Sequence, residues 1–491
     1  MTNGTMIQFF HWYLPEGLWN LTQKEAEKLA NLGINAIWLP PAFKGTDGSN
    51  ARGYNLYDLY DLGEFDQKGS VATRYGTKQE YLNCIKKLQS LKIQVYADVV
   101  LNHMGGADET ETVTVRKVDP ENRNQFISEP YQIEAYTKFT FPGRNGKYSQ
   151  FVWNFNCFSG VDYDDKNKET AIFSIQNEYG DKWEDVMNDE KGNYDYLMYS
   201  DIDYRNEAVR EEIKRWGKWY LETAQFDGVR LDAIKHMPPQ MIAEWLDYMR
   251  TLKPELFAVG EYWSPRNLPA MLKYIEATGG KLALFDACLH QNMHEASTKG
   301  RDYDLTTIFN DTLVVANAPL AVTLIDNHDT QPLQMLEAPV ENWFKPLSYA
   351  LVLLREAGYP CVFYPDLYGA KYTGKGRDGN DYEIMLPKCE KLEKLLVARK
   401  EFAYGMQRDY IDHPNCIGWT REGLDENEKS GCAVLLSNSE NGNKWMDVGK
   451  RNAGKTFVDY LQYTDIEVKI NEDGWGEFTV AGGKVCVWVA K

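Results

Sequence analysis

The chain has 491 residues, of which 43% are hydrophobic and 26% charged, the proportions of a globular protein with a large core. Its net charge is −18, from 54 basic and 72 acidic residues, so we expect neither nucleic acid nor an anionic membrane as a partner. Aromatic residues make up 13% of the chain. Aromatic faces suit sugar rings, although core packing is the simpler explanation of this figure.

The N-terminal sequence and the cysteines predict an intracellular location. MTNGTMIQFFHWY lacks the basic start and the small-residue cleavage site of a signal peptide. No stretch approaches the 18 or so apolar residues of a membrane span. The eight cysteines form no CxxC pair and no spaced framework, which is typical of reduced, buried thiols. We therefore expect a cytoplasmic protein that acts as a monomer.

Eight short apolar runs in the first four-fifths of the chain predict strands that are buried on both faces. The runs begin at Thr5, Asn35, Gln94, Phe226, Glu255, Leu282, Leu320 and Pro360. Helical patterns separate most of them, most clearly at 212–224, 240–253 and 343–358. Eight strands that alternate with helices predict an α/β fold, the (β/α)8 or TIM barrel. An open doubly wound sheet is the alternative, and the count of eight strands makes it the weaker one.

Two further regions complete the predicted architecture. The stretch between Gln94 and Phe226 holds roughly a hundred residues more than the ~30 of one βα unit, which predicts an inserted domain after the third strand. After about residue 398, short alternating runs separated by Asn, Gly and Asp predict an all-β domain, a Greek-key sandwich. The predicted boundaries are 1–104 and 208–397 for the barrel, 105–207 for the insert and 398–491 for the C-terminal domain.

Polar side chains, most of them ionisable, gather where four of the predicted strands end, which is where the active sites of such barrels lie. They are Asp98, Asn102 and His103 on the third run, Arg230, Asp232, Lys235 and His236 on the fourth, Glu261 on the fifth, and Asp326, His328 and Asp329 on the seventh. A charged residue in a buried strand costs free energy unless it is paired or used. Their coincidence at one rim therefore favours a catalytic site over isolated structural ion pairs.

The spacing of two carboxylates indicates a particular chemistry. Asp232 and Glu261 follow consecutive strands, which lie about 4.8 Å apart in a sheet, so their carboxyl groups could approach the ~5.5 Å of a retaining glycosidase pair. Arg230 lies two residues before Asp232 on the same side of the strand, and its charge would keep Asp232 ionised. Apolar neighbours would raise the pKa of Glu261, and Asp329 offers a third carboxylate across the rim. The same residues also fit a metal-dependent lyase with Lys235 as base.

Four segments resemble the signature regions of glycoside hydrolase family 13, the α-amylases. They are DVVLNH (98–103), GVRLDAIKH (228–236), GEYW (260–263) and LIDNHDTQ (324–331). Segments 57–77, 192–206 and 343–360 resemble the liquefying bacterial α-amylases, and the N-terminal FFHWYLPEG resembles their cytoplasmic enterobacterial relatives. The resemblance covers essentially the whole chain. It implies a retaining endo-hydrolase of α-1,4-glucosidic bonds in starch, glycogen or maltodextrin.

The resemblance also implies a role for each residue of the rim. Asp232 would be the nucleophile, Glu261 the general acid and base, and Asp329 the stabiliser of the transition state. The implied substrate-binding residues are Arg230, which would orient the nucleophile, His103 and His328 on the reacting sugar, Tyr57 stacked on its ring, and Lys235, His236 and Trp263 on the leaving-group side. Rim packing is the alternative for the two aromatic members of this set.

An acidic group of residues predicts a metal site. Asp162, Asp195, Asp201 and Asp203 lie in the insert, and Asn102 and His236 lie in the barrel. Oxygen ligands of this kind suit Ca²⁺, although acidic loops are usually only solvated. The resemblance implies a Ca²⁺ on Asn102, Asp195, Asp201 and the carbonyl of His236, joined by Asp162. A second metal ion, Na⁺ or Ca²⁺, is less expected, because the relatives have Asp where this chain has Glu184.

Three alternatives stay open on the sequence alone. A transglycosylating or maltooligosaccharide-forming enzyme would share the four segments and differ only in its acceptor or its products. A glucan-binding protein without activity would need only the aromatic residues, so the three carboxylates speak against it. A metal-dependent lyase would require Mg²⁺ for activity.

Overall fold

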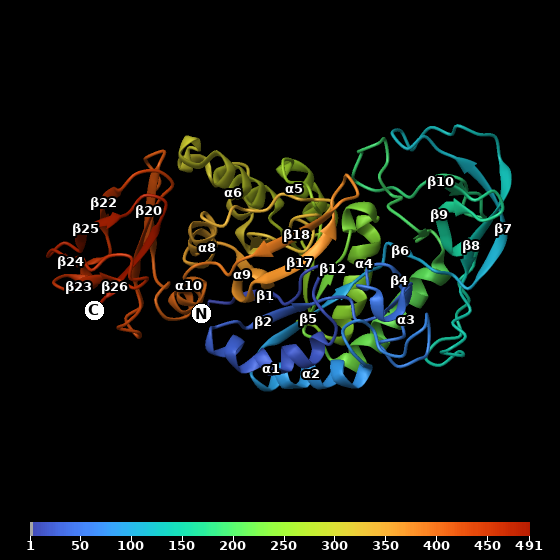
Figure 1. Cartoon of the computed structure of the whole chain (residues 1–491), viewed down its shortest axis with the longest axis horizontal. Coiled ribbons are helices and arrows are strands. Elements are labelled where there is room, and N and C mark those ends of the chain that lie inside the picture. Colours follow the sequence, from blue (N-terminus) through green and yellow to red (C-terminus); the bar gives the residue numbers. More distant parts are fainter. Residues whose placement is uncertain (1–2) are drawn as a thin grey trace.

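The computed structural model describes residues 3–491. At its centre, parallel strands close into a barrel in the order β1-β16-β15-β14-β13-β12-β5-β2 (Figure 1). The strands are β1 (Met6–Gln8), β2 (Ala36–Leu39), β5 (Gln94–Val99), β12 (Gly228–Leu231), β13 (Phe257–Gly260), β14 (Ala283–Phe285), β15 (Ala321–Leu324) and β16 (Tyr359–Phe363). Each of the apolar runs in the sequence supplies one of them, so the predicted (β/α)8 barrel is confirmed.

Helices cover the outside of the barrel. The longer ones are α1 (Leu18–Asn31), α2 (Lys78–Ser90), α3 (Glu207–Ala224), α4 (Pro239–Leu252), α5 (Leu268–Ala277), α6 (Ala287–Lys299), α8 (Lys345–Leu353) and α10 (Leu392–Glu401). Local sequence fixes where several begin: Thr77 and Glu80 form a capping box at α2, and Asn206 caps α3. Along α3 the buried residues recur every three or four positions, so one face of this helix packs inward.

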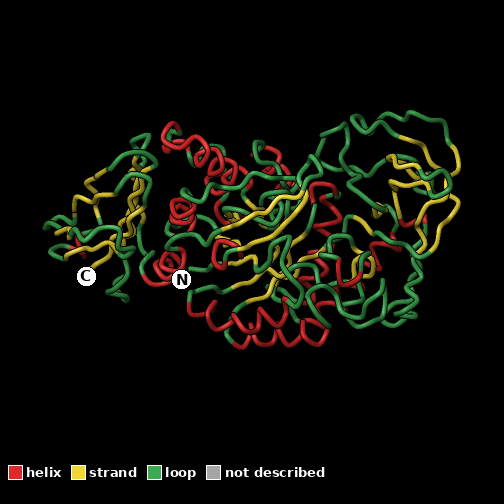
Figure 2. The backbone as a smooth tube through the Cα atoms, in the orientation of Figure 1, coloured by secondary structure: helices red, strands yellow, loops and turns green. Residues whose placement is uncertain are grey.

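The segment between β5 and α3 folds into a separate sheet with the order β6-β11-β9-β10-β7-β8. Its strands are β6 (His103–Met104), β7 (Glu109–Lys117), β8 (Tyr131–Lys138), β9 (Phe158–Asp164), β10 (Glu169–Ile175) and β11 (Ser200–Ile202). The insertion after the third barrel strand is therefore confirmed, and the boundaries 105–207 stay a prediction. Figure 2 shows long loops around this sheet, at the end of the molecule opposite the C-terminal strands.

The C-terminal region is all β, as predicted, with one sheet in the order β19-β20-β21-β26-β23-β24 and a second made by β22 and β25. The strands are β19 (Gln407–Tyr410), β20 (Cys416–Arg421), β21 (Cys432–Ser437), β22 (Gly442–Asp447), β23 (Thr456–Asp459), β24 (Glu467–Lys469), β25 (Trp475–Val480) and β26 (Val485–Ala490). Side chains of both sheets, among them Met446, Phe478 and Trp488, form one buried core.

Two features differ from the sequence prediction. The predicted boundary at 397/398 falls inside α10, whose buried Leu395, Leu396 and Ala398 join the main core that also contains the barrel strands. A hairpin of β17 (Ala370–Lys375) and β18 (Asp381–Leu386) follows the last barrel strand and was not predicted. Most of its residues are exposed or half-buried, whether polar or apolar, so it lacks the continuous buried run of a barrel strand.

The eight cysteines are buried free thiols, in agreement with the sequence interpretation. Over residues 3–491, no helix is both long and hydrophobic enough to span a bilayer.

Candidate active site

The register of three neighbouring strands brings the charged residues of the rim together. Arg230 on β12 lies opposite Asp98 on β5, and β13 pairs with the other side of β12. The hydrogen-bond ladder continues past the strand ends: the N–H of Asp232 donates to Val99 O at 3.0 Å, and that of Glu261 donates to Leu231 O at 2.9 Å. Both carboxylates thus start from backbone positions that the barrel itself fixes.

The guanidinium of Arg230 connects three carboxylates. Its Nη1 lies 2.5 Å from Asp232 Oδ1 and 2.9 Å from Asp98 Oδ1, and its Nη2 lies 2.8 Å from Glu261 Oε2. The Arg230 side chain is 1% exposed, so water screens these contacts very little. The pairing of Arg230 with Asp232 that the sequence suggested is present, and the same cation also holds the second carboxylate.

Asp98 is part of this network, although sequence reasoning gave it no role. Its Oδ2 accepts hydrogen bonds from Trp38 Nε1 at 2.9 Å and from the hydroxyl of Tyr54 at 2.7 Å. Its other oxygen contacts Arg230. The sequence signal that could have identified Asp98 is a carboxylate inside an otherwise apolar strand, because such a residue must be paired to be buried.

Burial dominates the electrostatics of the rim. It raises the pKa of Asp232 to about 6; the charge of Asp98 also raises this pKa, while Arg230 lowers it. Burial likewise raises the pKa of Glu261 and, more strongly, that of Asp329. Four carboxylates face one fixed cation, so we expect the cluster to keep a proton near neutral pH. The expectation that Arg230 keeps Asp232 ionised stays a prediction, since Arg230 lowers this pKa while burial raises it.

His328 is buried and neutral, because burial and the charge of Arg230 hold its pKa well below the usual range. The side-chain amide of Gln8, on β1, donates to His328 Nδ1 at 3.0 Å. The imidazole proton then resides on Nε2, which lies 3.4 Å from Asp329 Oδ2. Gln8 thus orients His328 towards the third carboxylate, a contact that the sequence analysis missed.

The tyrosine beside the carboxylates is Tyr54, not Tyr57. The ring of Tyr54 is stacked on His328, with centroids 5.0 Å apart. Tyr57 is 1% exposed, its hydroxyl donates to Asp108 at 2.7 Å, and the ammonium of Lys68 lies 4.0 Å from its ring centroid. Tyr57 thus lies against Asp108 and Lys68 rather than against Arg230 and its carboxylates, and its substrate-stacking role stays a prediction.

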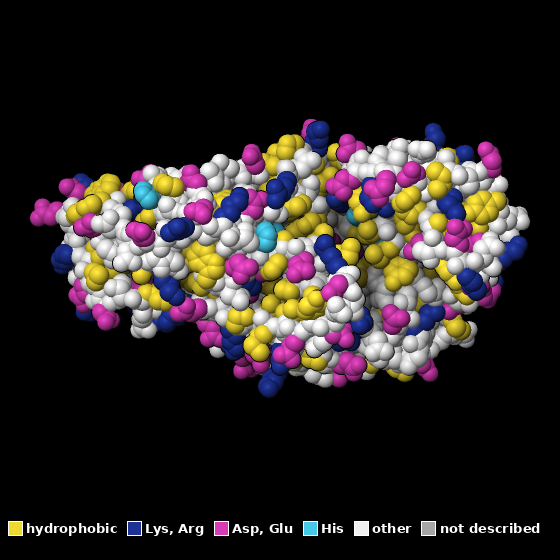
Figure 3. All heavy atoms as spheres, turned by 45° about the horizontal axis from the view of Figure 1, so that its top comes forward, with side chains coloured by type: hydrophobic (Ala, Val, Ile, Leu, Met, Phe, Trp, Pro, Cys, Tyr) yellow, Lys and Arg dark blue, Asp and Glu magenta, His cyan; other side chains and the backbone are white. Residues whose placement is uncertain are grey.

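The remaining predicted substrate-binding residues lie on two sides of the carboxylates. His103 is buried beside Tyr54, and its Nε2 lies 2.8 Å from the carbonyl oxygen of that residue. Lys235 and Trp263 line an open groove of about 530 Å³, together with Glu190 and other residues. Lys235 Nζ pairs with Glu190 Oε1 at 2.8 Å, which connects a loop of the insert to the barrel. The space-filling view shows a hollow between these two parts of the molecule (Figure 3).

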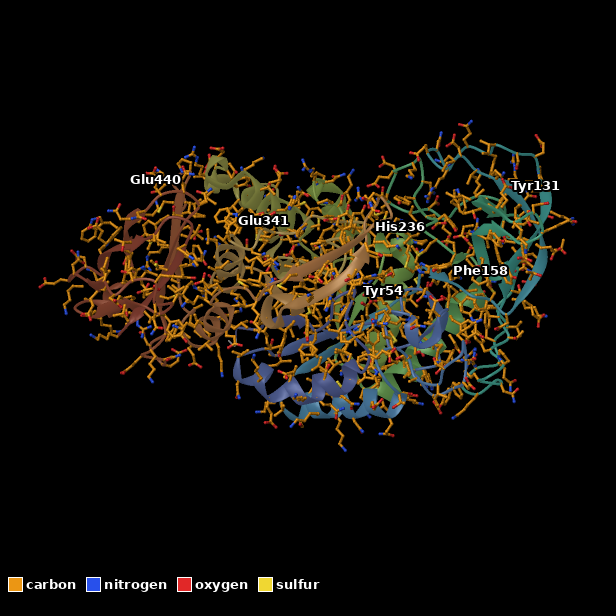
Figure 4. All side chains as sticks on the ribbon, in the orientation of Figure 1. Tyr54, Tyr131, Phe158, His236, Glu341 and Glu440 are labelled. Carbon is orange, nitrogen blue, oxygen red and sulfur yellow. The ribbon has the colours of Figure 1, made fainter. Side chains whose placement is uncertain are left out.

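His236 contacts the insert rather than the open rim. Its Nδ1 donates to the carbonyl of Tyr194 at 2.6 Å, and the two rings meet edge to face with centroids 4.3 Å apart. Figure 4 shows His236 between the barrel and the insert. Its side chain is thus engaged in joining the two parts, and a direct contact with substrate stays a prediction.

The predicted metal-binding aspartates are only partly brought together. Within residues 3–491, no group of three or more His, Cys, Asp or Glu side chains is arranged to hold a metal ion. Asp203 forms a two-pronged pair with Arg205, with contacts of 2.8 and 2.7 Å, and Asp162 accepts from the N–H of Tyr199 at 3.0 Å. The four aspartates therefore do not form a single cluster of this kind in the described residues, and their role as metal ligands stays a prediction.

A smaller set of oxygen donors does meet at the junction of the barrel and the insert. Asn102 Nδ2 lies 3.3 Å from Asp201 Oδ1. Burial and the charge of Asp201 raise the pKa of Asp195 well above the usual range, and burial with the charges of Glu184 and Asp203 raises that of Asp201 likewise. Glu184 and Asp203 add further negative charge nearby. Buried carboxylates that repel one another are the donor chemistry that a hard divalent cation favours, so these residues fit Ca²⁺.

The chain matches two family models. Residues 21–390 match the model described as alpha amylase, catalytic domain, and residues 432–489 match the model described as alpha-amylase C-terminal. The first match contains the barrel strands from β2 to β16 and the whole insert, and therefore all four strand ends of the rim.

Individual proteins agree with this assignment. A cytoplasmic alpha-amylase from Escherichia coli (strain K12) is 50% identical over 100% of this chain and 99% of its own length. A glucan 1,4-alpha-maltohexaosidase from Bacillus sp. (strain 707) is 45% identical over 100% of this chain and 93% of its own length. The crystal structure of an α-amylase from Geobacillus thermoleovorans complexed with acarbose superposes with a TM-score of 0.65 at 18% identity, over 100% and 98% of the two chains, which shows a common fold.

Proposed function

Because the chain belongs to the α-amylase family, we propose that the carboxylates around Arg230 are the site at which it hydrolyses α-1,4-glucosidic bonds in starch, glycogen or maltodextrin. The observation that carries the proposal is the bridge from Arg230 to both Asp232 and Glu261. It holds two acids of adjacent strands at one rim, as a double displacement requires.

In the proposed reaction, Asp232 attacks the anomeric carbon of the sugar while the bond from that carbon to the glycosidic oxygen breaks. Glu261 gives its proton to the departing oxygen, so the leaving chain ends in a hydroxyl. Glu261, now ionised, then takes a proton from water, and the hydroxide attacks the same carbon and releases Asp232. The pKa of Glu261 is raised, as an acid requires, but that of Asp329 is raised more strongly, so the assignment of Glu261 as the initial acid rests on the bridge from Arg230 that holds it beside Asp232.

Neighbouring side chains would stabilise the sugar during these steps. Asp329 would stabilise positive charge on the ring when the proton of the cluster lies on Glu261. His328 Nε2 lies 3.4 Å from Asp329 Oδ2, and its contact with a sugar hydroxyl stays a prediction. Tyr54, which lies beside His328, would be better placed than Tyr57 for the stacking role that the resemblance implied for Tyr57, and His103 lies beside Tyr54. Hydrogen bonds that strengthen in the transition state raise the rate and not only the affinity.

We further propose that Asn102, Asp195, Asp201 and the main-chain carbonyl of His236 hold a Ca²⁺ ion. Such an ion would neutralise the buried carboxylates and tie the insert to the barrel. The contacts of His236 with Tyr194 and of Lys235 with Glu190 already join these parts, so the ion would add to an existing junction. The name of the Escherichia coli relative and the free thiols support a cytoplasmic enzyme with intracellular glucans as substrates.

The stereochemistry of the first product tests the proposed mechanism. Two displacements at one carbon retain its configuration, so the new reducing end should be the α anomer. Proton NMR during the first minutes of amylose hydrolysis distinguishes α from β before mutarotation mixes them. An initial β product would rule out Asp232 as a covalent nucleophile.

A maltooligosaccharide-forming or transglycosylating enzyme is the second candidate, favoured by the identity of 45% to a maltohexaosidase. Chromatography of amylose products over time separates the possibilities. A single dominant short product from the start indicates a maltooligosaccharide-forming enzyme, products longer than an oligosaccharide substrate indicate transfer, and a broad early distribution indicates endo-hydrolysis.

A further inference from the structure

Lys345 is a second buried cation that joins carboxylates at the ends of barrel strands. It begins α8, and its Nζ lies 2.8 Å from Asp326 Oδ2 and 2.5 Å from Asp366 Oδ1. Asp326 follows β15, and Asp366 follows β16 in the short helix α9 (Tyr364–Tyr368). The three side chains, which we call the Lys345 cluster, are at most 4% exposed. Lys345 thus connects two neighbouring strand ends, as Arg230 connects those of β5, β12 and β13.

Both carboxylates of the Lys345 cluster have a partner on each oxygen. Asp366 Oδ2 accepts from the hydroxyl of Tyr349 at 2.6 Å, and Asp326 Oδ1 accepts from the N–H of Val340 at 3.1 Å. Burial lowers the pKa of Lys345, but the charges of Asp326 and Asp366 raise it above the usual value, so the ammonium is charged. Such a network fixes the orientation of each carboxylate and, through the backbone, the segments that carry them.

Stability alone does not account for these buried charges. Taking ions out of water costs free energy, and replacing a buried ion pair by apolar side chains of similar volume is often neutral or stabilising. The surroundings would accept an apolar side chain, because the other residues of α8 are buried and mostly apolar. The charged cluster, by contrast, imposes one arrangement on the two strand ends that it joins.

Asp326 belongs to the turn that carries His328 and Asp329. The side-chain oxygen of Asn327 accepts from the N–H of Asp329 and from that of Thr330, at 2.8 Å each, so the turn is internally fixed. A movement of Asp326 would therefore carry the Asp329 carboxylate with it.

We propose that Lys345 and Asp326 are positioning residues for Asp329, because their ion pair sets the place of the turn that carries this carboxylate. The inference rests on the proposed function, in which Asp329 stabilises positive charge on the reacting sugar. Lys345 is buried, so it acts through Asp326 and does not contact the sugar. A displacement of about 1 Å in a catalytic group can lower the rate by up to about a hundredfold, so a small shift of the turn is enough to affect turnover.

Two variants of the full-length protein make the same chemical change on the two sides of Lys345. Asp326→Asn breaks the connection to the turn and keeps the pair of Lys345 with Asp366, whereas Asp366→Asn breaks that pair and keeps the connection. Each leaves one cation facing one carboxylate, so both should fold with a similarly lowered Tm. On a short maltooligosaccharide, kcat should fall roughly thirtyfold in Asp326→Asn and less than about threefold in Asp366→Asn. KM should change little in either, because a group that acts in the transition state contributes to kcat.

A double-mutant cycle shows whether the loss passes through Asp329. Asp329→Asn removes the charge that the turn positions, so adding Asp326→Asn to it should lower kcat by less than about twofold. A general loss of structure would instead lower kcat by the same factor in both backgrounds. A nitrophenyl maltooligosaccharide, whose leaving group departs readily, keeps the residual rates measurable.

Arg399→Met is the control for the loss of a buried cation. Arg399 is 4% exposed, and its guanidinium donates to Leu353 O at 2.5 Å, at the far end of α8 from Lys345, and to Gly4 O at 2.9 Å. This variant should have a lower Tm and a kcat within about twofold of the wild type.

Equal kcat values in Asp326→Asn and Asp366→Asn would overturn the positioning role. So would a loss from Asp326→Asn that is equally large without the Asp329 carboxylate. In both cases an active wild type would leave the proposed function in place. A wild type that hydrolyses no α-glucan would contradict the proposed function itself, and the positioning role with it.

Discussion

The ring of Tyr54 lies parallel to that of His328, with an angle of 15° between their planes and centroids 5.0 Å apart. Trp12 lies parallel to both, at 5.9 Å from Tyr54 and 6.1 Å from His328. The hydroxyl of Tyr54 reaches Asp98, which in turn contacts Arg230. This stack is an aromatic wall next to the carboxylates, made from segments that are far apart in the sequence.

Replacing Tyr54 should therefore impair catalysis, whereas replacing Tyr57 should not. We expect Tyr54→Ala to lower kcat/KM on a short maltooligosaccharide roughly thirtyfold, the equivalent of about 2 kcal/mol of transition-state stabilisation. Tyr54→Phe keeps the ring and should lose much less. Tyr57→Phe removes only the hydrogen bond to Asp108, so kcat/KM should change less than about twofold, with a small decrease in Tm. A larger catalytic loss in Tyr57→Phe than in Tyr54→Ala would contradict this assignment.

Asp232→Asn should abolish turnover while preserving the fold. The substitution retains the size of the side chain and removes the charge that attacks the sugar, so we expect kcat to fall at least about a thousandfold. Asp227→Asn is the matched control, since Asp227 lies just before the other end of β12 and pairs with Lys253 at 2.8 Å. The control should lower Tm but leave kcat within about twofold. Retention of a tenth of wild-type turnover by Asp232→Asn would exclude the covalent role.

The pH dependence of kcat/KM should be bell-shaped. Below the pKa of Asp232, raised to about 6, the nucleophile is protonated and the rate falls as the pH decreases. At higher pH the rate falls once Glu261, whose pKa is also raised, loses the proton it must donate. Stopped assays on a short maltooligosaccharide across the range would reveal both limbs. A rate that stays constant well below pH 5 would show that Asp232 does not titrate as expected.

Asp98 offers a way to move the acidic limb. Its negative charge raises the pKa of Asp232, so Asp98→Asn should lower that pKa and shift the acidic limb to lower pH. The maximal rate should also decrease, because Asp98 accepts hydrogen bonds from Tyr54 and Trp38. The shift of the limb distinguishes an electrostatic role from mere loss of packing, which would lower the rate at every pH equally.

The sequence was sufficient for the barrel because buried parallel strands are continuous apolar runs, and four of the eight runs end near residues of the candidate site. It was insufficient where side-chain direction depends on a loop. Tyr54 and Tyr57 are three residues apart in the segment after β2, and no periodicity there indicates which ring faces the carboxylates. The backbone that decides this is set by contacts with distant residues, such as Asp98 and Asp108.

The acidic residues of the insert show the same limitation. Alternation placed Asp201 and Asp203 on one side of an extended segment, which suggested two metal ligands. In the structure, Asp203 pairs with Arg205 only two residues later, whereas Asp201 contacts Asn102 and Ser159. Composition identifies a cluster of acids, but only the fold shows which protein groups each carboxylate contacts.

The last prediction concerns the proposed Ca²⁺ on Asn102, Asp195 and Asp201. An ion that binds only the native state would stabilise it by about 2.7 kcal/mol at a hundredfold excess over its dissociation constant. EDTA should therefore lower the apparent Tm and the activity together, and added Ca²⁺ should restore both, whereas Mg²⁺ is too small to do so well. Asp201→Asn should have the lowered Tm even without EDTA, and EDTA should not lower it further. Asp165 is an acidic surface residue of the same insert that pairs with Lys168, so EDTA should lower the Tm of Asp165→Asn as it lowers that of the wild type. Unchanged Tm and turnover after exhaustive EDTA, with no Ca²⁺ by elemental analysis, would show that the buried acids share protons instead of a metal ion.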